Sequence, residues 1–264
     1  DKLNFSISKI ILEGPADQLQ LTKNTQPAIL TVSYSIYKVF KEEFDFNIDL
    51  FKFFAGHSLG EYSALVCSNS INFTDALFLL YERGKAMQEA VPLGEGSMIA
   101  VLGTEIDYIN EILNSSKIKG VCEIANDNAA GQVILSGDKN KILSIQTELK
   151  QKKIKTIPLK VSAPFHCSLM KPAAKAMEEK INSTKFLSPS HKVINNVTAK
   201  SEDNSEIIKK LLIDQIFSTV KWRDSIIEMS KTGVKNFIEI GPGKVLTGMV
   251  KRTIKDVNCF SINS

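Results

Sequence analysis

A serine flanked by two glycines lies directly after an apolar run in this chain of 264 residues. The pentapeptide Gly56-His57-Ser58-Leu59-Gly60 follows the run Phe51-Lys52-Phe53-Phe54-Ala55 and precedes helix-forming residues. A serine at a sharp turn from a strand into a helix projects its Oγ at the carboxyl end of the strand, where it can attack a carbonyl carbon. The two glycines are expected to let the backbone pass close to its neighbours. The pattern predicts a nucleophile, Ser58, although such a string also arises by chance.

A serine hydroxyl needs a base, and the chain offers three histidines: His57, His166 and His191. His57 adjoins the serine and is expected to point to the opposite face of the strand, as a structural hydrogen-bonding group. His191 lies in a polar stretch and is expected to be exposed. His166 follows Pro164 by two residues, in the first turn of an expected helix, where the helix dipole would keep the imidazole neutral. We therefore expect His166 to be the base; the alternative is a helix-cap histidine without a chemical role.

The acid that would orient such a histidine is not identified by any motif. Asp214, Asp224 and Glu239 lie in suitable regions, but nothing in the pattern distinguishes one of them. A backbone carbonyl could hold the imidazole instead, and a serine–histidine dyad of that kind suits group transfer.

Arg83 is one of only three arginines, and it lies on the apolar side of an expected helix. A buried guanidinium requires an anion, so we expect Arg83 to bind a carboxylate of the substrate in a bidentate manner. The alternative is that its head reaches Glu82 or the solvent. Its neighbours at four and seven residues' distance are Ala76, Leu79, Met87 and Ala90.

The periodicity of the chain predicts an α/β protein. Before residue 95 it indicates a helix from Gln26-Pro27, the strand 51–55, a helix to about Ser68 and a helix over 74–91. After residue 161 it indicates a helix over 164–185, a strand over 192–197, helices over 207–217 and 220–229, a strand over 237–240 and a helix over 244–254.

In the middle of the chain, the order of predicted strands and helices changes. Strands and helices are expected in the order β-α-β-β-α-β, which is typical of a small ferredoxin-like unit. The polar stretch 126–131 between the two central strands suits a loop or an edge that faces a ligand. We therefore expect a catalytic domain made of residues 1–94 and 162–264, with a subdomain of residues 95–161 inserted into it.

Composition narrows the function classes. The net charge of +4 is small and spread along the chain, which does not favour nucleic-acid binding but allows attraction to an acidic protein. No apolar run approaches the roughly 20 residues of a membrane span, and no secretory signal is evident. The four cysteines lack the spacing of a zinc site or a disulfide framework. We expect an intracellular protein without a metal.

Several longer stretches form a familiar set, which comprises 56–65, Tyr81-Glu82-Arg83-Gly84-Lys85-Ala86-Met87-Gln88, Thr25-Gln26-Pro27-Ala28, 164–172 and 241–248. In these stretches the chain resembles the malonyl-CoA:acyl-carrier-protein transacylases of type II fatty acid synthesis. The similarity runs in the expected order over essentially the whole chain.

The resemblance implies an α/β-hydrolase-like parallel-sheet core with the inserted ferredoxin-like subdomain. It implies that Ser58 attacks the thioester of malonyl-CoA, that His166 takes and returns the proton, and that Arg83 holds the malonyl carboxylate. A carbonyl of Gln215 would orient the histidine, and the N–H of Leu59 would be one oxyanion donor. The other residues expected at the substrate site are Gln26, Met87 and Asn128.

The partners implied by the resemblance are malonyl-CoA and acyl carrier protein, whose phosphopantetheine thiol receives the acyl group. Lys153 and Lys155 belong to a lysine-rich run, which is usually just a solvated face but could help to dock this acidic carrier. No cofactor beyond the CoA thioester is expected, and the chain is expected to be a monomer. Its compartment would be the bacterial cytoplasm, or a plastid-like or mitochondrial organelle with type II synthesis.

One departure from the family concerns the N-terminus. Members begin with a strand and a loop rich in glycine and glutamine that supplies a second oxyanion donor, and nothing in the printed sequence before the first motif matches that segment. Either the numbered chain begins after that segment, or this is a truncated form; if the donor is truly absent, turnover is expected to fall by roughly 10²–10³. Two other functions therefore stay open: a serine hydrolase or thioesterase acting on acyl-CoA, and a catalytically impaired form that binds CoA or carrier protein.

Overall fold

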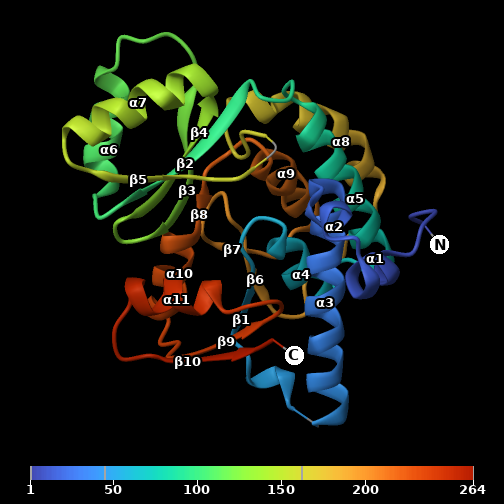
Figure 1. Ribbon diagram of the computed structural model, residues 1–264. Coiled ribbons are helices and arrows are strands. Elements are labelled where there is room, and N and C mark those ends of the chain that lie inside the picture. The colour runs from blue at the N-terminus through green and yellow to red at the C-terminus, as the bar shows by residue number, and fades with distance from the viewer. Residues whose placement is uncertain (1, 45, 162, 264) are drawn as a thin grey trace.

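The computed structural model describes residues 2–44, 46–161 and 163–263, with helices packed around the sheets (Figure 1). The helices are α1 (Ile7–Glu13), α2 (Ala16–Gln20), α3 (Thr22–Glu43), α4 (Gly60–Cys67), α5 (Phe73–Glu89), α6 (Ile106–Ser115), α7 (Lys139–Gln151), α8 (Lys171–Ser183), α9 (Ser205–Gln215), α10 (Trp222–Lys231) and α11 (Val245–Thr253), with 3₁₀ turns η1 (Ile48–Leu50) and η2 (Ser168–Met170).

The strands within the described residues form sheets with the orders β1-β6-β7, β10-β9 and β5-β2-β4-β3-β8. The strands are β1 (Phe53–Ala55), β2 (Gly96–Leu102), β3 (Cys122–Ala129), β4 (Gln132–Asp138), β5 (Lys155–Pro158), β6 (Lys192–Ile194), β7 (Ser201–Glu202), β8 (Val220–Lys221), β9 (Asn236–Ile240) and β10 (Asn258–Ile262).

The parallel pair β1 and β6 positions the serine turn. Ala55 pairs with Ile194, so the carboxyl ends of both strands meet at one edge of the sheet. The residues that follow β1, including Ser58, therefore lie beside the residues that follow β6. The strand predicted over 192–197 ends at Ile194 because the side chain of Asn195 accepts hydrogen bonds from the backbone of the next turn instead.

The five-stranded sheet is built mainly from the middle of the chain (upper left in Figure 1). β4 pairs antiparallel with β2 and β3, β5 pairs antiparallel with β2, and the element order is the predicted β-α-β-β-α-β. β8, from 220–221, extends the same sheet parallel to β3. The division at residues 95 and 161 stays a prediction, and the expected boundary residue 162 lies outside the described residues.

The sequence suggested that the polar stretch 126–131 is a loop or an edge that faces a ligand, but most of it belongs to a strand. β3 continues to Ala129, and the turn comprises only the residues before Gln132, with Gly131 at φ +66°. Asn126, Asp127 and Asn128 are buried strand residues. A polar strand can be buried here because its side chains find partners: Asp127 binds Arg223 at 2.9 Å, and Asn128 binds His57 at 2.8 Å.

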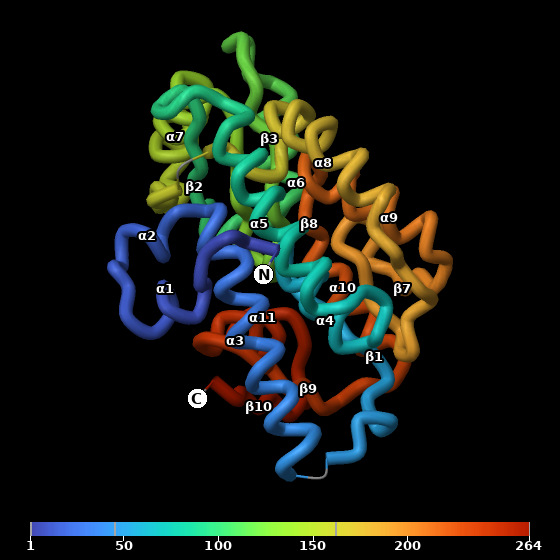
Figure 2. Tube along the Cα trace, turned by 90° about the vertical axis from the view of Figure 1, so that its right-hand side faces the viewer, coloured from blue at the N-terminus to red at the C-terminus, as the bar shows by residue number. Residues whose placement is uncertain are grey.

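The helices α3, α4, α5, α8 and α9 enclose the largest apolar core. Figure 2 shows α3 beside α4, α5 and β9, in agreement with their contacts. Each of these five helices contributes buried side chains to the core, for example Leu30, Leu65, Leu79, Met177 and Leu212. α3 begins at Thr22, before the predicted Gln26-Pro27.

No helix among the described residues is both long and apolar enough to span a bilayer.

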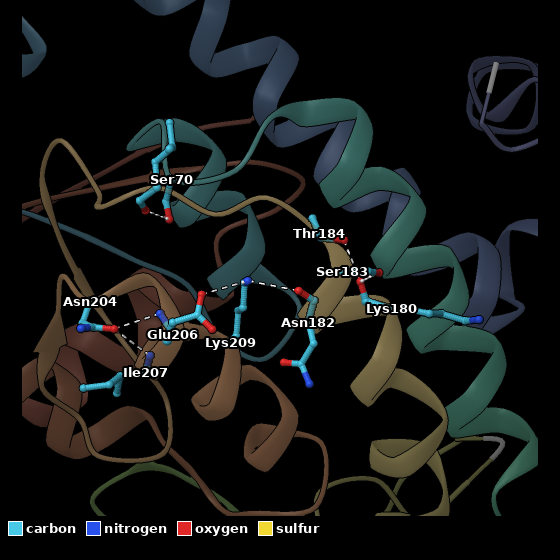
Figure 3. Close-up of polar contacts among 10 residues, drawn as sticks. Ser70, Lys180, Asn182, Ser183, Thr184, Asn204, Glu206, Ile207 and Lys209 are labelled. Atoms are coloured by element: carbon cyan, nitrogen blue, oxygen red, sulfur yellow. Dashed lines mark hydrogen bonds and ion pairs between the residues drawn. The ribbon is translucent and has the colours of Figure 1, made fainter.

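Polar contacts in the link between α8 and α9 fix where α9 begins. The Asn204 side chain accepts hydrogen bonds from the N–H groups of Glu206 and Ile207 and so begins α9. Lys209 Nζ donates to the Asn182 carbonyl at 3.2 Å and pairs with Glu206 at 3.0 Å (Figure 3). These contacts anchor the helix whose last residue is Gln215.

The two glycines of the serine turn differ in their steric role. A Cβ placed at Gly56 would lie 1.9 Å from the carbonyl oxygen of Gly60, whereas a Cβ at Gly60 would have nothing within 4 Å. The expectation of close backbone passage is therefore right for Gly56 and wrong for Gly60. The turn requires a glycine only before the serine.

This difference gives a matched pair of variants. We expect Gly56→Ala to lower the free energy of unfolding by at least about 2 kcal/mol, because the overlap is with backbone that cannot move aside. Gly60→Ala should stay within about 0.5 kcal/mol of the wild type. Chemical denaturation of both variants measures the difference, and equal losses would contradict this steric explanation.

Candidate active site

Ser58 lies in a strained turn between β1 and α4. Its φ is +53°, a left-handed conformation that non-glycine residues rarely adopt. The side chain of Asn196, which follows β6, bridges the turn: its Oδ1 accepts from the Ser58 N–H at 2.6 Å and its Nδ2 donates to the Gly56 carbonyl at 2.9 Å. The strain is held by these two bonds, and the hydroxyl projects from the turn.

His166 is the histidine that reaches this hydroxyl. Its Nε2 lies 2.7 Å from Ser58 Oγ, and its Nδ1 lies 2.8 Å from the backbone carbonyl of Gln215. A carbonyl can only accept, so Nδ1 carries the proton, and in the neutral ring Nε2 accepts from the serine O–H. The carbonyl is free for this bond because Gln215 ends α9, where carbonyls lack helical partners.

The neutrality of His166 has a different cause from the predicted one. The residue has φ +57° and lies in a turn before η2, so the expected helix over 164–185 is wrong at its start; α8 begins only at Lys171. The imidazole is only 5% exposed. Burial, with a smaller contribution from the positive charge of Arg83, lowers the pKa of His166 from 6.5 to about 3.

Arg83 extends from α5 to the same hydroxyl and is only 1% exposed. Its Nη2 donates to Ser58 Oγ at 3.2 Å and to Gln215 Oε1 at 2.8 Å, and its Nη1 donates to Gln26 Oε1 at 2.6 Å. Burial lowers its pKa. Glu82 does not pair with it, since that carboxylate lies 3.5 Å from Lys180.

The guanidinium has hydrogen-bonding capacity to spare. Its Nε is buried with no hydrogen-bond partner among the described residues, and none of their carboxylates forms an ion pair with it. Gln26, whose Oε1 accepts from Arg83, directs its Nε2 toward the sulfur of Met87 at 3.8 Å. A buried arginine surrounded by amides and a thioether, beside an activated serine, is suited to bind an anionic group.

Some of the other residues predicted for the site lie near Ser58, and others do not. Asn128 Oδ1 lies 2.8 Å from His57 Nε2, and burial lowers the pKa of His57. The N–H of Leu59 lies at the N-terminal end of α4. Lys153 and Lys155 are exposed beside and on β5, and no described contact links them to the Ser58 cluster.

A cleft of about 850 Å³ opens between β1 and β9. Its lining includes His57, Leu59 and Trp222 but none of Ser58, His166 and Arg83. The cleft therefore lies behind the serine turn.

Among the described residues no group of three or more histidine, cysteine or acidic side chains is arranged to hold a metal ion.

Comparison with known proteins agrees with this geometry. A protein-family model described as the acyl transferase domain matches residues 1–262. The chain belongs to the acyl transferase domain family. The relatives of this acyl transferase domain include the malonyl CoA-acyl carrier protein transacylase of Haemophilus influenzae, which is 39% identical over 264 residues covering 100% of this chain and 84% of that protein. That of Bacillus subtilis is 40% identical over 266 residues, covering 100% and 82%.

Solved structures are equally similar to this acyl transferase domain. The acyl-carrier-protein-S-malonyltransferase of Bartonella henselae matches with a TM-score of 0.96 and 42% identity, over 100% of this chain and 84% of that one. A malonyl-transacylase solved in complex with a type II PKS acyl-carrier protein matches with a TM-score of 0.95 and 36% identity, over 100% and 85%. The resemblance seen in the sequence and the α/β fold class are confirmed.

Two residues at the site of this acyl transferase domain escaped the sequence analysis, Asn196 and Glu61. Asn196 lies within the strand predicted over 192–197, and the pairing of β6 with β1, which brings Asn196 to the serine turn, is not visible in the sequence. Glu61 lies in the first turn of α4, where acidic residues are common for electrostatic reasons alone. The side-chain amide of Gln215 was missed as well, since the resemblance implied only a carbonyl.

The lowered pKa of His166 predicts a pH dependence of stability. Because the folded-state pKa of about 3 lies below the ordinary 6.5, the contribution to stability is complete above pH 6.5 and is lost as the pH falls toward 3. We expect the unfolding free energy of the wild type to fall more steeply over this range than that of His166→Gln. Chemical denaturation at a series of pH values tests this, and parallel curves would rule out a buried neutral imidazole.

Proposed function

We propose that this chain transfers the malonyl group from malonyl-CoA to the phosphopantetheine thiol of acyl carrier protein, which makes it a malonyltransferase that supplies fatty acid elongation. The observation that carries the proposal is the meeting of three groups: Ser58 Oγ lies 2.7 Å from His166 Nε2 and 3.2 Å from the buried Arg83 Nη2. A nucleophile, a base and a carboxylate-binding cation are the groups that this transfer needs. The names of the relatives support the same substrate and partner.

In the first half-reaction Ser58 Oγ attacks the thioester carbonyl of malonyl-CoA while His166 Nε2 takes the hydroxyl proton. The Gln215 carbonyl, bonded to Nδ1–H, stabilises the imidazolium that forms. The N–H of Leu59, at the N-terminal end of α4, is the proposed donor to the oxyanion. When the C–S bond breaks, His166 returns the proton to the CoA sulfur, and a malonyl-serine ester remains.

The second half-reaction uses the same groups in reverse. The carrier's thiol gives its proton to His166 Nε2 and attacks the ester carbonyl. The bond to Ser58 Oγ then breaks, and the proton passes from His166 to the serine. A base whose pKa is held at about 3 is neutral at the start of each half-reaction at physiological pH.

Arg83 would select the acyl group by its charge. Its N–H groups are shared among Gln26, Gln215 and Ser58, all of them neutral partners. A malonyl carboxylate would supply the anion that a buried guanidinium requires, whereas an acetyl group would not. Gln26 and Met87 would line the same pocket, and Asn128 would hold His57 beside it.

The substrates of the reaction indicate which surface the carrier protein would contact and in which compartment the chain would act. The exposed Lys153 and Lys155 are proposed as part of the surface that attracts the acidic carrier. The proposed compartment is one in which malonyl-CoA and the carrier occur together, the bacterial cytoplasm or an organelle with type II fatty acid synthesis.

The direct test is intact-protein mass spectrometry after mixing the chain with malonyl-CoA, beside a Ser58→Ala control. We expect one malonyl adduct that is absent from the control and is discharged by acyl carrier protein. Steady CoA release without an adduct would indicate a hydrolase. No adduct and no CoA release would indicate a binding form without a working oxyanion hole.

A second test addresses the carboxylate. We expect Arg83→Ala to lower kcat/KM for malonyl-CoA at least about 100-fold more than for acetyl-CoA, because two charge-assisted hydrogen bonds are lost only with the former. Lys85→Ala, an exposed change on the same helix, is the matched control and should alter neither value more than about twofold. Equal losses on both thioesters in Arg83→Ala would refute the role of the guanidinium.

A further inference from the structure

Glu61 is a buried carboxylate that the reaction described above does not use. It lies in the first turn of α4, three residues after Ser58, and is only 2% exposed. No lysine, arginine or histidine among the described residues lies within ion-pair distance of it. Burial raises its pKa to about 7. A buried acidic group without a salt bridge is costly, so its hydrogen bonds must compensate.

Both hydrogen bonds go to one oxygen of Glu61. Oε2 accepts from the backbone N–H of Asn196 at 3.0 Å and from the side-chain Nε2 of Gln215 at 2.7 Å. The first bond supports the residue that bridges the serine turn. The second reaches the residue that contacts both His166 and Arg83.

The contact with Glu61 fixes the orientation of the Gln215 amide. Nε2 also donates to the Ser58 carbonyl at 3.0 Å, and Oε1 accepts from Arg83 Nη2 at 2.8 Å. A rotated amide would place its oxygen against the Glu61 oxygen and the Ser58 carbonyl, and its NH₂ against the guanidinium. The contacts of the oxygen with the Ser58 carbonyl and with the ionised form of Glu61, and of the NH₂ with the guanidinium, would all be repulsive. Because Gln215 is 0% exposed, water cannot compensate for them.

The orientation of this amide in turn sets the position of Arg83 Nη2, the nitrogen that also reaches Ser58 Oγ. We propose that Glu61 is a positioning residue which, through the Gln215 side-chain amide, holds Arg83 in place to prefer an acyl group that carries a carboxylate. The inference rests on the proposed function for the identity of that acyl group. It adds a residue without substrate contact that determines the selectivity of the site.

Binding to a chain that cannot be acylated separates this inference from the transfer reaction. In a Ser58→Ala background, the dissociation constants of malonyl-CoA and acetyl-CoA are measured by calorimetry. We expect this background to prefer malonyl-CoA, and Glu61→Ala to lower that preference by about tenfold. Glu61→Gln should keep it within about twofold, because one amide oxygen can accept both hydrogen bonds. The mass-spectrometric test on the wild type reports on transfer independently.

The ratio of the affinities for malonyl-CoA and acetyl-CoA shows whether Glu61 positions Arg83 or only stabilises the site as a whole. Loss of the bond to Asn196 disturbs the serine turn and affects both thioesters equally, whereas loss of the bond to Gln215 affects only malonyl-CoA. Adding Arg83→Ala to Glu61→Ala should change the ratio no further than Arg83→Ala alone. Equal weakening of both thioesters in Glu61→Ala, an equally large loss in Glu61→Gln, or no preference in the Ser58→Ala background would each overturn the proposal.

A further variant keeps the test decisive if Glu61→Ala fails to fold. Gln215→Met removes the side-chain amide but retains the backbone carbonyl that holds His166. We expect it to lower the preference for malonyl-CoA by a similar factor. An unchanged ratio in a folded Gln215→Met chain would overturn the proposal as well.

Discussion

The burial of Arg83 is the constraint on which the site depends. A guanidinium removed from water must have its donors satisfied and its charge compensated, and the chain supplies only neutral partners at direct contact: Gln26, Gln215 and Ser58. Because this compensation is incomplete, the guanidinium is suited to an anionic partner. The same positive charge helps to keep His166 neutral by lowering its pKa.

Gln215 connects the parts of the site because its two polar ends face different partners. Its backbone carbonyl, left without a helical partner at the end of α9, holds the tautomer of His166 that accepts the serine proton. Its side-chain amide lies between Glu61 and Arg83. A residue at a helix end is well suited to both tasks, since the helix fixes its position while the last carbonyls stay available.

Local sequence patterns predicted the serine turn and most elements because these depend on neighbouring residues. The apolar run before Ser58 became β1, and the apolar face of residues near Arg83 became the buried side of α5. The errors have physical reasons too. The stretch 126–131 was interpreted as too polar for the core, yet its residues up to Ala129 lie in β3, where tertiary partners allow their burial. His166 adopts a left-handed conformation that no local pattern signals.

The sequence by itself predicted the residues that are proposed to carry the chemistry: a serine in a strand-to-helix turn, an arginine on an apolar helix face and one of three histidines. Only the tertiary structure decided how they meet. The pairing of β1 with β6 brings Asn196 to the serine turn, and the packing of α9 brings Gln215 between Glu61 and Arg83. These contacts join residues more than 100 positions apart, and hydrogen bonds at such separations leave no periodic trace in a single sequence.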